Sequence, residues 1–116
     1  MTDGKDNKGV SGRCTTGAQE ITALVDYAVD SIVSKTIIDA PAGTITLFAF
    51  DKGQRLSEHT ASYDAVVQIL DGKAQLTIQG RSFPAKAGEI IIMPANIPHA
   101  VTANERCKML LTMIRA

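Results

Sequence analysis

The sequence predicts a single all-β domain, a sandwich or barrel preceded by one short helix. Short runs of β-branched and apolar residues recur from about residue 31 to the end of the chain, separated by turn residues. Regular short strands of this kind are typical of a β-sandwich or β-barrel. The length of 116 residues fits one domain that can bury a core without disulfides.

The N-terminal part predicts a tail and then a helix. The first 17 residues, MTDGKDNKGVSGRCTTG, hold almost nothing apolar, so we expect a flexible tail at 1–17 before a domain at 18–116. Apolar residues then recur with a helical period in AQEITALVDYAVDSIV. Its later part is β-branched and favours a strand. We therefore expect a short helix near 18–27 and a strand near 31–38.

The rest of the chain alternates as strands do. TITLFAFD alternates between two faces, one of which carries Ile45, Leu47 and Ala49. AVVQIL and KAQLTIQ are separated by Asp71-Gly72, which predicts a hairpin because type I′ turns need positive φ. Gly80-Arg81 predicts another turn. The later strands are expected in SFPAK, EIIIM, HAVTA and KMLLTMI.

Composition excludes several classes of function. The 12 basic and 12 acidic residues balance, which argues against a nucleic-acid surface. No apolar run approaches the roughly 20 residues that span a bilayer, and the N-terminus lacks the apolar segment of a signal peptide. We therefore expect a cytoplasmic protein without membrane contact. Cys107 is expected to be buried, and Cys14 to be a free thiol.

Two segments resemble the signature motifs of the cupin superfamily. They are GQRLSEHTASYDAVVQILDG, from Gly53 to Gly72, and GEIIIMPANIPHAVTAN, from Gly88 to Asn104. The resemblance spans roughly residues 31–114. It implies a double-stranded β-helix, the jelly-roll barrel of small single-domain cupins of the RmlC-like, conserved-barrel kind. In metal-binding members, three imidazoles and one carboxylate from neighbouring strands hold one divalent ion.

This chain carries only part of that metal-binding pattern. His59 and His99 stand at histidine positions of the two motifs. Ala61 stands where the second histidine is expected, and Ala65 stands at the glutamate position. The resemblance therefore implies an incomplete metal site with two of the four usual ligands. Asn96 replaces a glycine, a mild change because Asn tolerates the left-handed conformation.

The resemblance implies that His59 and His99 share one barrel cavity. By strand parity with His59, residues 61, 63 and 65 face inward, whereas Asp64 would need a bulge to turn inward as a ligand or histidine partner. Tyr63 either places its hydroxyl at the mouth or packs as an aromatic ring. The expected ligand pocket comprises His59, Ala61, Tyr63, Asp64, Ala65, Val67, Met93, His99 and Met109.

We favour small-molecule binding in this cavity as the function. One alternative is a divalent-metal enzyme of dioxygenase or isomerase type that uses His59 and His99. Another is a metal-free epimerase or isomerase in which a histidine beside an aspartate acts as general base. Two imidazoles without a carboxylate suit Zn, Ni or Cu at partial occupancy better than Fe or Mn.

The apolar content of the N-terminal half predicts a symmetric homodimer. ITALVDYAVDSIV and ITLFAF hold more apolar residues than one face of a small barrel needs to cover. An exposed apolar patch of this kind is most often buried by two-fold pairing.

Overall fold

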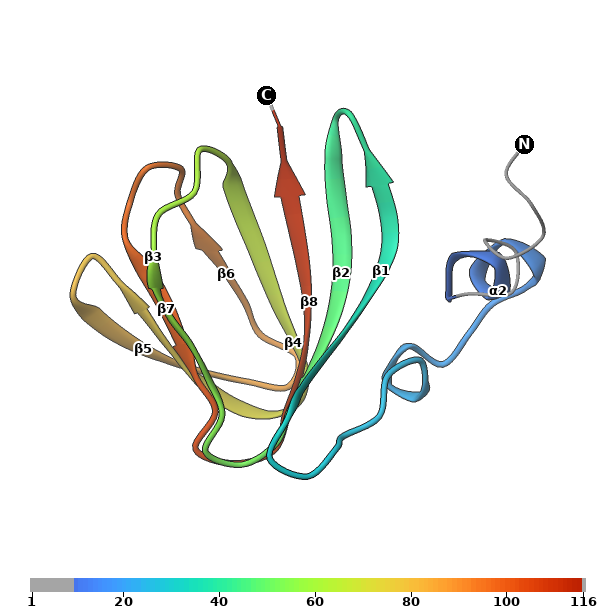
Figure 1. Cartoon of the computed structure of the whole chain (residues 1–116), viewed down its shortest axis with the longest axis horizontal. Coiled ribbons are helices and arrows are strands. Elements are labelled where there is room, and N and C mark those ends of the chain that lie inside the picture. Colours follow the sequence, from blue (N-terminus) through green and yellow to red (C-terminus); the bar gives the residue numbers. More distant parts are fainter. Residues whose placement is uncertain (1–9, 116) are drawn as a thin grey trace.

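The computed structural model describes residues 10–115, which form eight strands around an apolar interior (Figure 1). Helix α2 (Val10–Thr16) and the short 3-10 helix η1 (Ile21–Ala23) precede the strands. The predicted all-β jelly-roll barrel with one short N-terminal helix is confirmed. The strands are β1 (Ile32–Ala40), β2 (Gly43–Phe50), β3 (Arg55–His59), β4 (Asp64–Ile78), β5 (Arg81–Lys86), β6 (Ile90–Met93), β7 (His99–Thr102) and β8 (Cys107–Ile114).

The strands pair antiparallel in two walls that share β4. The first half of β4 pairs with β8 and β6, and β8 continues the wall through β2 to β1. The second half of β4 pairs with β5 and β7, and β7 continues to β3. Figure 1 shows the two walls diverging toward the end of the barrel where β8 finishes. One long strand therefore joins the two walls.

The predicted hairpin at Asp71-Gly72 is wrong, because β4 runs through this position without a break. The register against β8 shifts between Ile69 and Asp71, and Gly72 has a φ of 72°. A Cβ atom on Gly72 would lie 1.9 Å from the carbonyl oxygen of Arg106. The glycine thus permits a bulge where β4 passes from one wall to the other, rather than a chain reversal.

The hairpin turn lies further along the chain. Gln79 and Gly80 connect β4 to β5 with φ angles of 51° and 79°, and Ile78 pairs with Arg81. Positive φ at both central residues is the requirement of a type I′ turn. The sequence placed a turn at Gly80-Arg81, so its position is shifted by one residue.

The N-terminal helix does not lie where the periodicity placed it. Helix α2 occupies Val10–Thr16, inside the segment expected to be a flexible tail, and only the three residues of η1 lie within 18–27. Residues 1–9 of the expected tail lie outside the described residues. The apolar period instead marks a largely irregular segment whose Leu24 and Val25 are buried. Tertiary packing therefore overrides the local helical pattern.

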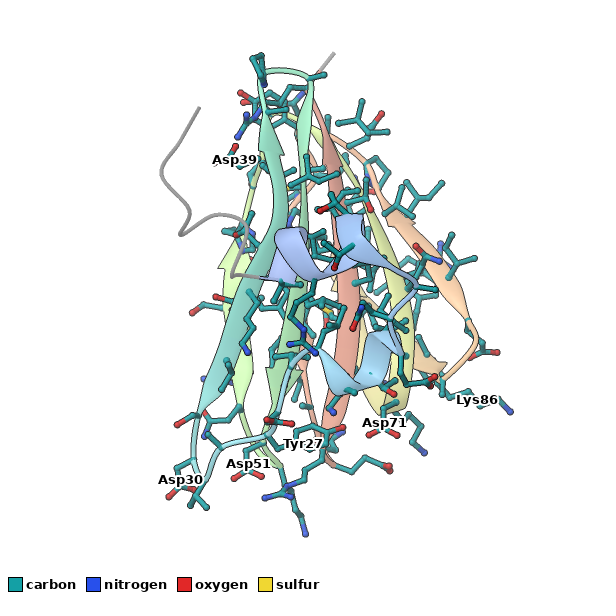
Figure 2. The ribbon with its side chains drawn as sticks, turned by 90° about the vertical axis from the view of Figure 1, so that its right-hand side faces the viewer. Tyr27, Asp30, Asp39, Asp51, Asp71 and Lys86 are labelled. Atoms are coloured by element: carbon teal, nitrogen blue, oxygen red, sulfur yellow. The ribbon has the colours of Figure 1, made fainter. Side chains whose placement is uncertain are left out.

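This N-terminal segment covers the outer face of one wall. Leu24 and Val25 form one buried cluster with Leu47 and Ala49 of β2. Figure 2 shows the segment crossing the strands from the outside. The alternation read from TITLFAFD is therefore correct, but the face carrying Leu47 and Ala49 turns away from the barrel interior.

Polar contacts anchor the end of the N-terminal segment. The Tyr27 hydroxyl donates to the Asp71 carboxylate at 2.5 Å. The backbone N–H of Asp30 donates to the Asp51 carboxylate at 2.7 Å, and the Arg106 guanidinium pairs with the same carboxylate at 2.9 Å. Figure 2 shows Tyr27, Asp30, Asp51 and Asp71 near one end of the barrel.

The inward side chains of both walls form the main core. Phe50, Val67, Leu76 and Met109 are fully buried there. Cys107 is buried as expected, and burial raises the pKa of its thiol to about 12. Across residues 10–115, the structure has no helix long and apolar enough to cross a membrane.

Candidate functional site

A small cavity lies between the two walls. It has a volume of about 40 Å³ and draws its lining from β3, β4, β6, β7, β8 and the loop after β3. Two histidines are its polar side chains, and the other lining side chains are apolar. The lining consists of Leu56, His59, Ala61, Ala65, Met93, His99, Val101, Met109, Leu111 and Met113.

An irregularity in β3 brings two of its residues into the cavity. Leu56 and His59 both line it, although a spacing of three would place them on opposite faces of a regular strand. The register between β3 and β7 shifts between these two residues, which turns both inward. β3 ends at His59, so it does not continue to residues 61, 63 and 65, as the parity argument assumed that it would.

The two histidines are direct neighbours across β3 and β7. His59 pairs with His99 in the register, and their Nε2 atoms lie 3.1 Å apart. The ring centroids are 4.4 Å apart at an interplanar angle of 74°. This short centroid separation means that the rings meet obliquely rather than end to end. Both Nε2 atoms therefore point toward a common region of the cavity wall.

Main-chain carbonyl groups lie beside the Nδ1 atom of each ring. The Nδ1 atom of His59 lies 2.9 Å from the carbonyl oxygen of Ser57, and that of His99 lies 3.1 Å from the carbonyl oxygen of Ile97. A carbonyl oxygen only accepts, so these two contacts favour the tautomer with its hydrogen on Nδ1, whereas the Nε2–Nε2 contact is a hydrogen bond only when one Nε2 carries a hydrogen. With the hydrogen on Nδ1, the Nε2 of a neutral ring holds a lone pair.

The two rings differ in their exposure to solvent. His99 is buried, with 3% of its surface exposed, whereas His59 is exposed. Burial lowers the pKa of His99, and the neighbouring His59 acts in the same direction. The hydrogen bond to Ile97 opposes this shift without cancelling it. Burial therefore favours the neutral form of the His99 ring.

The sequence-predicted pocket residues separate into two groups. His59, Ala61, Ala65, Met93, His99 and Met109 line the cavity.

Tyr63, Asp64 and Val67 lie elsewhere, contrary to the expectation. Tyr63 is exposed in the loop before β4, with the Arg115 guanidinium 5.8 Å from its ring. Asp64 begins β4, and its carboxylate accepts the backbone N–H of Ala95 at 2.8 Å. Val67 faces inward but belongs to the solid core. The parity argument failed at Tyr63 because β3 stops at His59 and a loop follows.

The residues around the mouth hold the loop after β6 in place. The backbone N–H of Asn96 donates to the carbonyl oxygen of Ala61 at 2.7 Å. Asn96 has a φ of 64°, so asparagine does occupy the left-handed conformation in place of the glycine of the motif. Asp64 therefore acts on this loop through Ala95, and not on the histidines.

Four lining residues lie outside the expected pocket, namely Leu56, Val101, Leu111 and Met113. Strand alternation could have indicated three of them, because Leu111 and Met113 share the face of Met109 on β8, and Val101 shares the face of His99 on β7. Leu56 enters through the bulge in β3, which the sequence does not signal.

The side chains present do not complete a four-ligand metal centre. Within residues 10–115, no group of three or more His, Cys, Asp or Glu side chains is placed to hold a metal ion. The described side chains of the cavity lining supply two Nε2 atoms as nitrogen ligands and otherwise only the thioether sulfurs of Met93, Met109 and Met113. No reaction step through a metal follows from this arrangement.

Comparisons with known proteins agree with the architecture. The cupin domain family matches residues 46–113. A protein of unknown function from Streptococcus pyogenes is 36% identical, with a TM-score of 0.83 over 86% of this chain and 88% of that chain. A cupin 2 conserved barrel domain protein from Leptotrichia buccalis is 40% identical, with a TM-score of 0.79 over 81% of this chain and 46% of that chain.

More distant structures share the fold alone. The polyketide cyclase RemF from Streptomyces resistomycificus is 22% identical, with a TM-score of 0.65 over 72% of this chain and 64% of that chain. No functionally curated protein matches the chain. The family match, the similar structures and the barrel architecture together show that the chain belongs to the cupin family.

Proposed function

We propose that this cupin binds a small molecule in the barrel cavity, beside the His59–His99 pair. The observation that carries the proposal is the composition of the lining, in which two converging imidazoles stand among apolar side chains. An apolar site with a few converging polar groups is the usual form of a ligand pocket. The histidines would orient the ligand, and the apolar side chains would provide the contact area.

The size of the cavity limits what enters it. One water molecule needs roughly 10–15 Å³ of such volume, so about 40 Å³ accommodates only a few atoms. Pockets for drug-sized ligands are about 300–1,000 Å³. The inserted part of the ligand is therefore a small head group, and any larger body lies outside the mouth.

Blocking the mouth tests the proposal. Ala61 lines the cavity from the loop after β3, so Ala61→Leu should fill the entrance without changing a strand. Ala87→Leu, at an exposed position between β5 and β6, is the matched control. We expect NMR screening of small molecules to give ligands that shift the His99 resonances of the wild type and the control. Ala61→Leu should lose these shifts, and unchanged binding in it would contradict the proposal.

The same geometry supports weak metal binding as a second candidate. Two Nε2 atoms 3.1 Å apart can act as neighbouring ligands of one ion, since Zn–N bonds are about 2.0–2.1 Å long. With no carboxylate supplying charge, we expect Zn, Ni or Cu at partial occupancy and poor retention of Fe or Mn. Elemental analysis of protein purified without an affinity tag tests this expectation. One equivalent of Fe or Mn per chain would favour a metalloenzyme instead.

We also propose a symmetric homodimer, through a different surface from the one that the sequence suggested. The apolar residues of the N-terminal segment and β2 largely cover one another within one chain. On the outer face of the same wall, a row of outward-facing residues runs in register across five strands. The row consists of Ile38, Ile45, Thr112, Val66 and Ile92.

Exposure along this row motivates the dimer. Ile38 and Ile92 are 49% and 57% exposed, and the neighbouring Ile114 is 51% exposed. Ile38 and Ile114 both line a surface hollow of about 240 Å³. Two-fold pairing would bury the patch against its own copy. Sedimentation velocity should show a dimer at micromolar concentration, and Ile38→Lys should give a monomer. A monomeric wild type would refute the assembly.

A further inference from the structure

The chemistry of the His59–His99 pair restricts the head group that the cavity accepts. Each Nδ1 atom lies beside a main-chain carbonyl oxygen, of Ser57 or of Ile97, and the two Nε2 atoms lie 3.1 Å apart. Two neutral rings carry only two hydrogens, so they cannot supply a donor to all three contacts at once. When both hydrogens are on Nδ1, both Nε2 atoms are acceptors and neither can satisfy the other. A hydrogen placed where the two lone pairs converge would reach both.

The surroundings restrict the charge of that head group. The other lining side chains are apolar, so the described lining holds no carboxylate to neutralise a cation. It also holds no lysine or arginine to attract an anion. A charged group entering such a site loses its hydration without an opposite charge in compensation. A neutral donor avoids this cost.

We propose that both rings carry their hydrogen on Nδ1, beside the carbonyl oxygens, and that the two Nε2 atoms form an acceptor-only clamp that selects a neutral head group with a hydroxyl or N–H donor. The inference rests on the proposed function, because it names the class of ligand for the same cavity. It predicts that a carbonyl group of equal size is rejected, since its oxygen would meet two further acceptors. Sites built for a substrate hydroxyl discriminate strongly against analogues that lack it.

Four probe molecules, each of four heavy atoms, test whether the cavity selects for a donor and against charge. Propan-2-ol and acetone differ by the donor alone, while isopropylammonium and acetate introduce the two charges. Each is titrated into the full-length protein at about pH 8, where a histidine of ordinary pKa is neutral. The imidazole ¹⁵N resonances report binding. We expect propan-2-ol to bind about tenfold or more tightly than each of the other three.

The same spectra test the clamp before any ligand is added. Both histidines should show the tautomer that carries its hydrogen on Nδ1. Finding the hydrogen on Nε2 of either ring would overturn the inference, because that ring would then be a donor.

His59→Gln supplies the sharpest variant. Position 59 is exposed, so the fold should tolerate the change, and the glutamine amide adds a donor to the site. The preference for propan-2-ol over acetone should fall toward unity, whereas Ala87→Leu should keep it. Acetone or acetate binding as well as propan-2-ol in the wild type overturns the acceptor clamp but leaves the proposed function standing. Binding of none of the four probes overturns the acceptor clamp, whereas the proposed function falls only if the wider NMR screen also gives no ligand that shifts the His99 resonances.

Discussion

The two ends of this barrel differ in how their polar side chains are paired. At the end of the N-terminal segment, polar groups of complementary type meet, as Tyr27 meets Asp71 and Asp51 meets Arg106. At the cavity, two groups of the same kind meet, the Nε2 atoms of His59 and His99, which we propose to be acceptors in both neutral rings. Complementary pairs stabilise a fold, whereas two acceptors that meet need a hydrogen-bond donor from a bound ligand.

The comparison extends to packing. Leu24 and Val25 pack on the outer surface of the wall against Leu47 and Ala49 in one buried cluster. The inner surface leaves a cavity, because Ala61 and Ala65 line it where larger side chains would fill it. The outside of the wall is therefore built for stability, and part of the inside is left open. Substitutions at the two places should differ accordingly.

The largest effect is expected from Leu47→Ala, which removes a fully buried side chain from under the N-terminal segment. Loss of buried volume from a leucine costs about 2–5 kcal/mol of unfolding free energy. Urea unfolding followed by circular dichroism measures the change. Val29→Ala, at a residue that is 75% exposed and outside the proposed dimer surface, is the control and should cost far less. Equal losses would mean that the N-terminal segment does not pack as described.

Asp51→Asn should have a smaller effect that depends on pH. The Asp30 N–H first, and then the Arg106 guanidinium, hold the pKa of Asp51 below its ordinary value. The wild type therefore gains stability above the unfolded pKa of about 3.9 and loses it as the pH falls through the folded pKa. Thermal unfolding should show a gap between wild type and Asp51→Asn at neutral pH that closes in acid. A gap that widens in acid would have the wrong sign.

Tyr27→Phe should lower the free energy of unfolding by less than Asp51→Asn does at neutral pH. The substitution removes the hydroxyl that donates to Asp71 but keeps the ring between the cationic groups of Arg106 and Lys108. One hydrogen bond contributes about 1 kcal/mol to unfolding free energy. Tyr63→Phe, in the exposed loop, should stay within about 0.5 kcal/mol of the wild type. Equal effects in urea unfolding would show that the contact with Asp71 does not stabilise the protein.

The smallest effect on stability is expected from His59→Ala. His59 is exposed, so its removal creates no buried cavity, and the unfolding free energy should stay within about 1 kcal/mol of the wild type. Ligand or metal binding in the cavity should nevertheless be lost, as NMR titration or elemental analysis would show. A loss of stability as large as that of Leu47→Ala would mean that His59 anchors the core instead.

Local patterns were enough to predict most strands and the pairing of the two histidines. Alternation along TITLFAFD and KMLLTMI follows from the period of two that a strand imposes on its side chains. His59 and His99 stand at motif positions, and the structure brings their Nε2 atoms to 3.1 Å. These features depend on residue spacing, which the chain itself carries.

Only the tertiary structure decided how those patterns are used. Asp71-Gly72 has the composition of a hairpin, yet β8 pairs on both sides of it and turns it into a bulge. The helical period around Leu24 and Val25 became an irregular cover, because burial against β2 outweighs a weak local preference. The tautomer of each histidine depends on carbonyl groups oriented by the ends of β3 and β7. Such contacts depend on strands meeting in space, and no single stretch of sequence determines them.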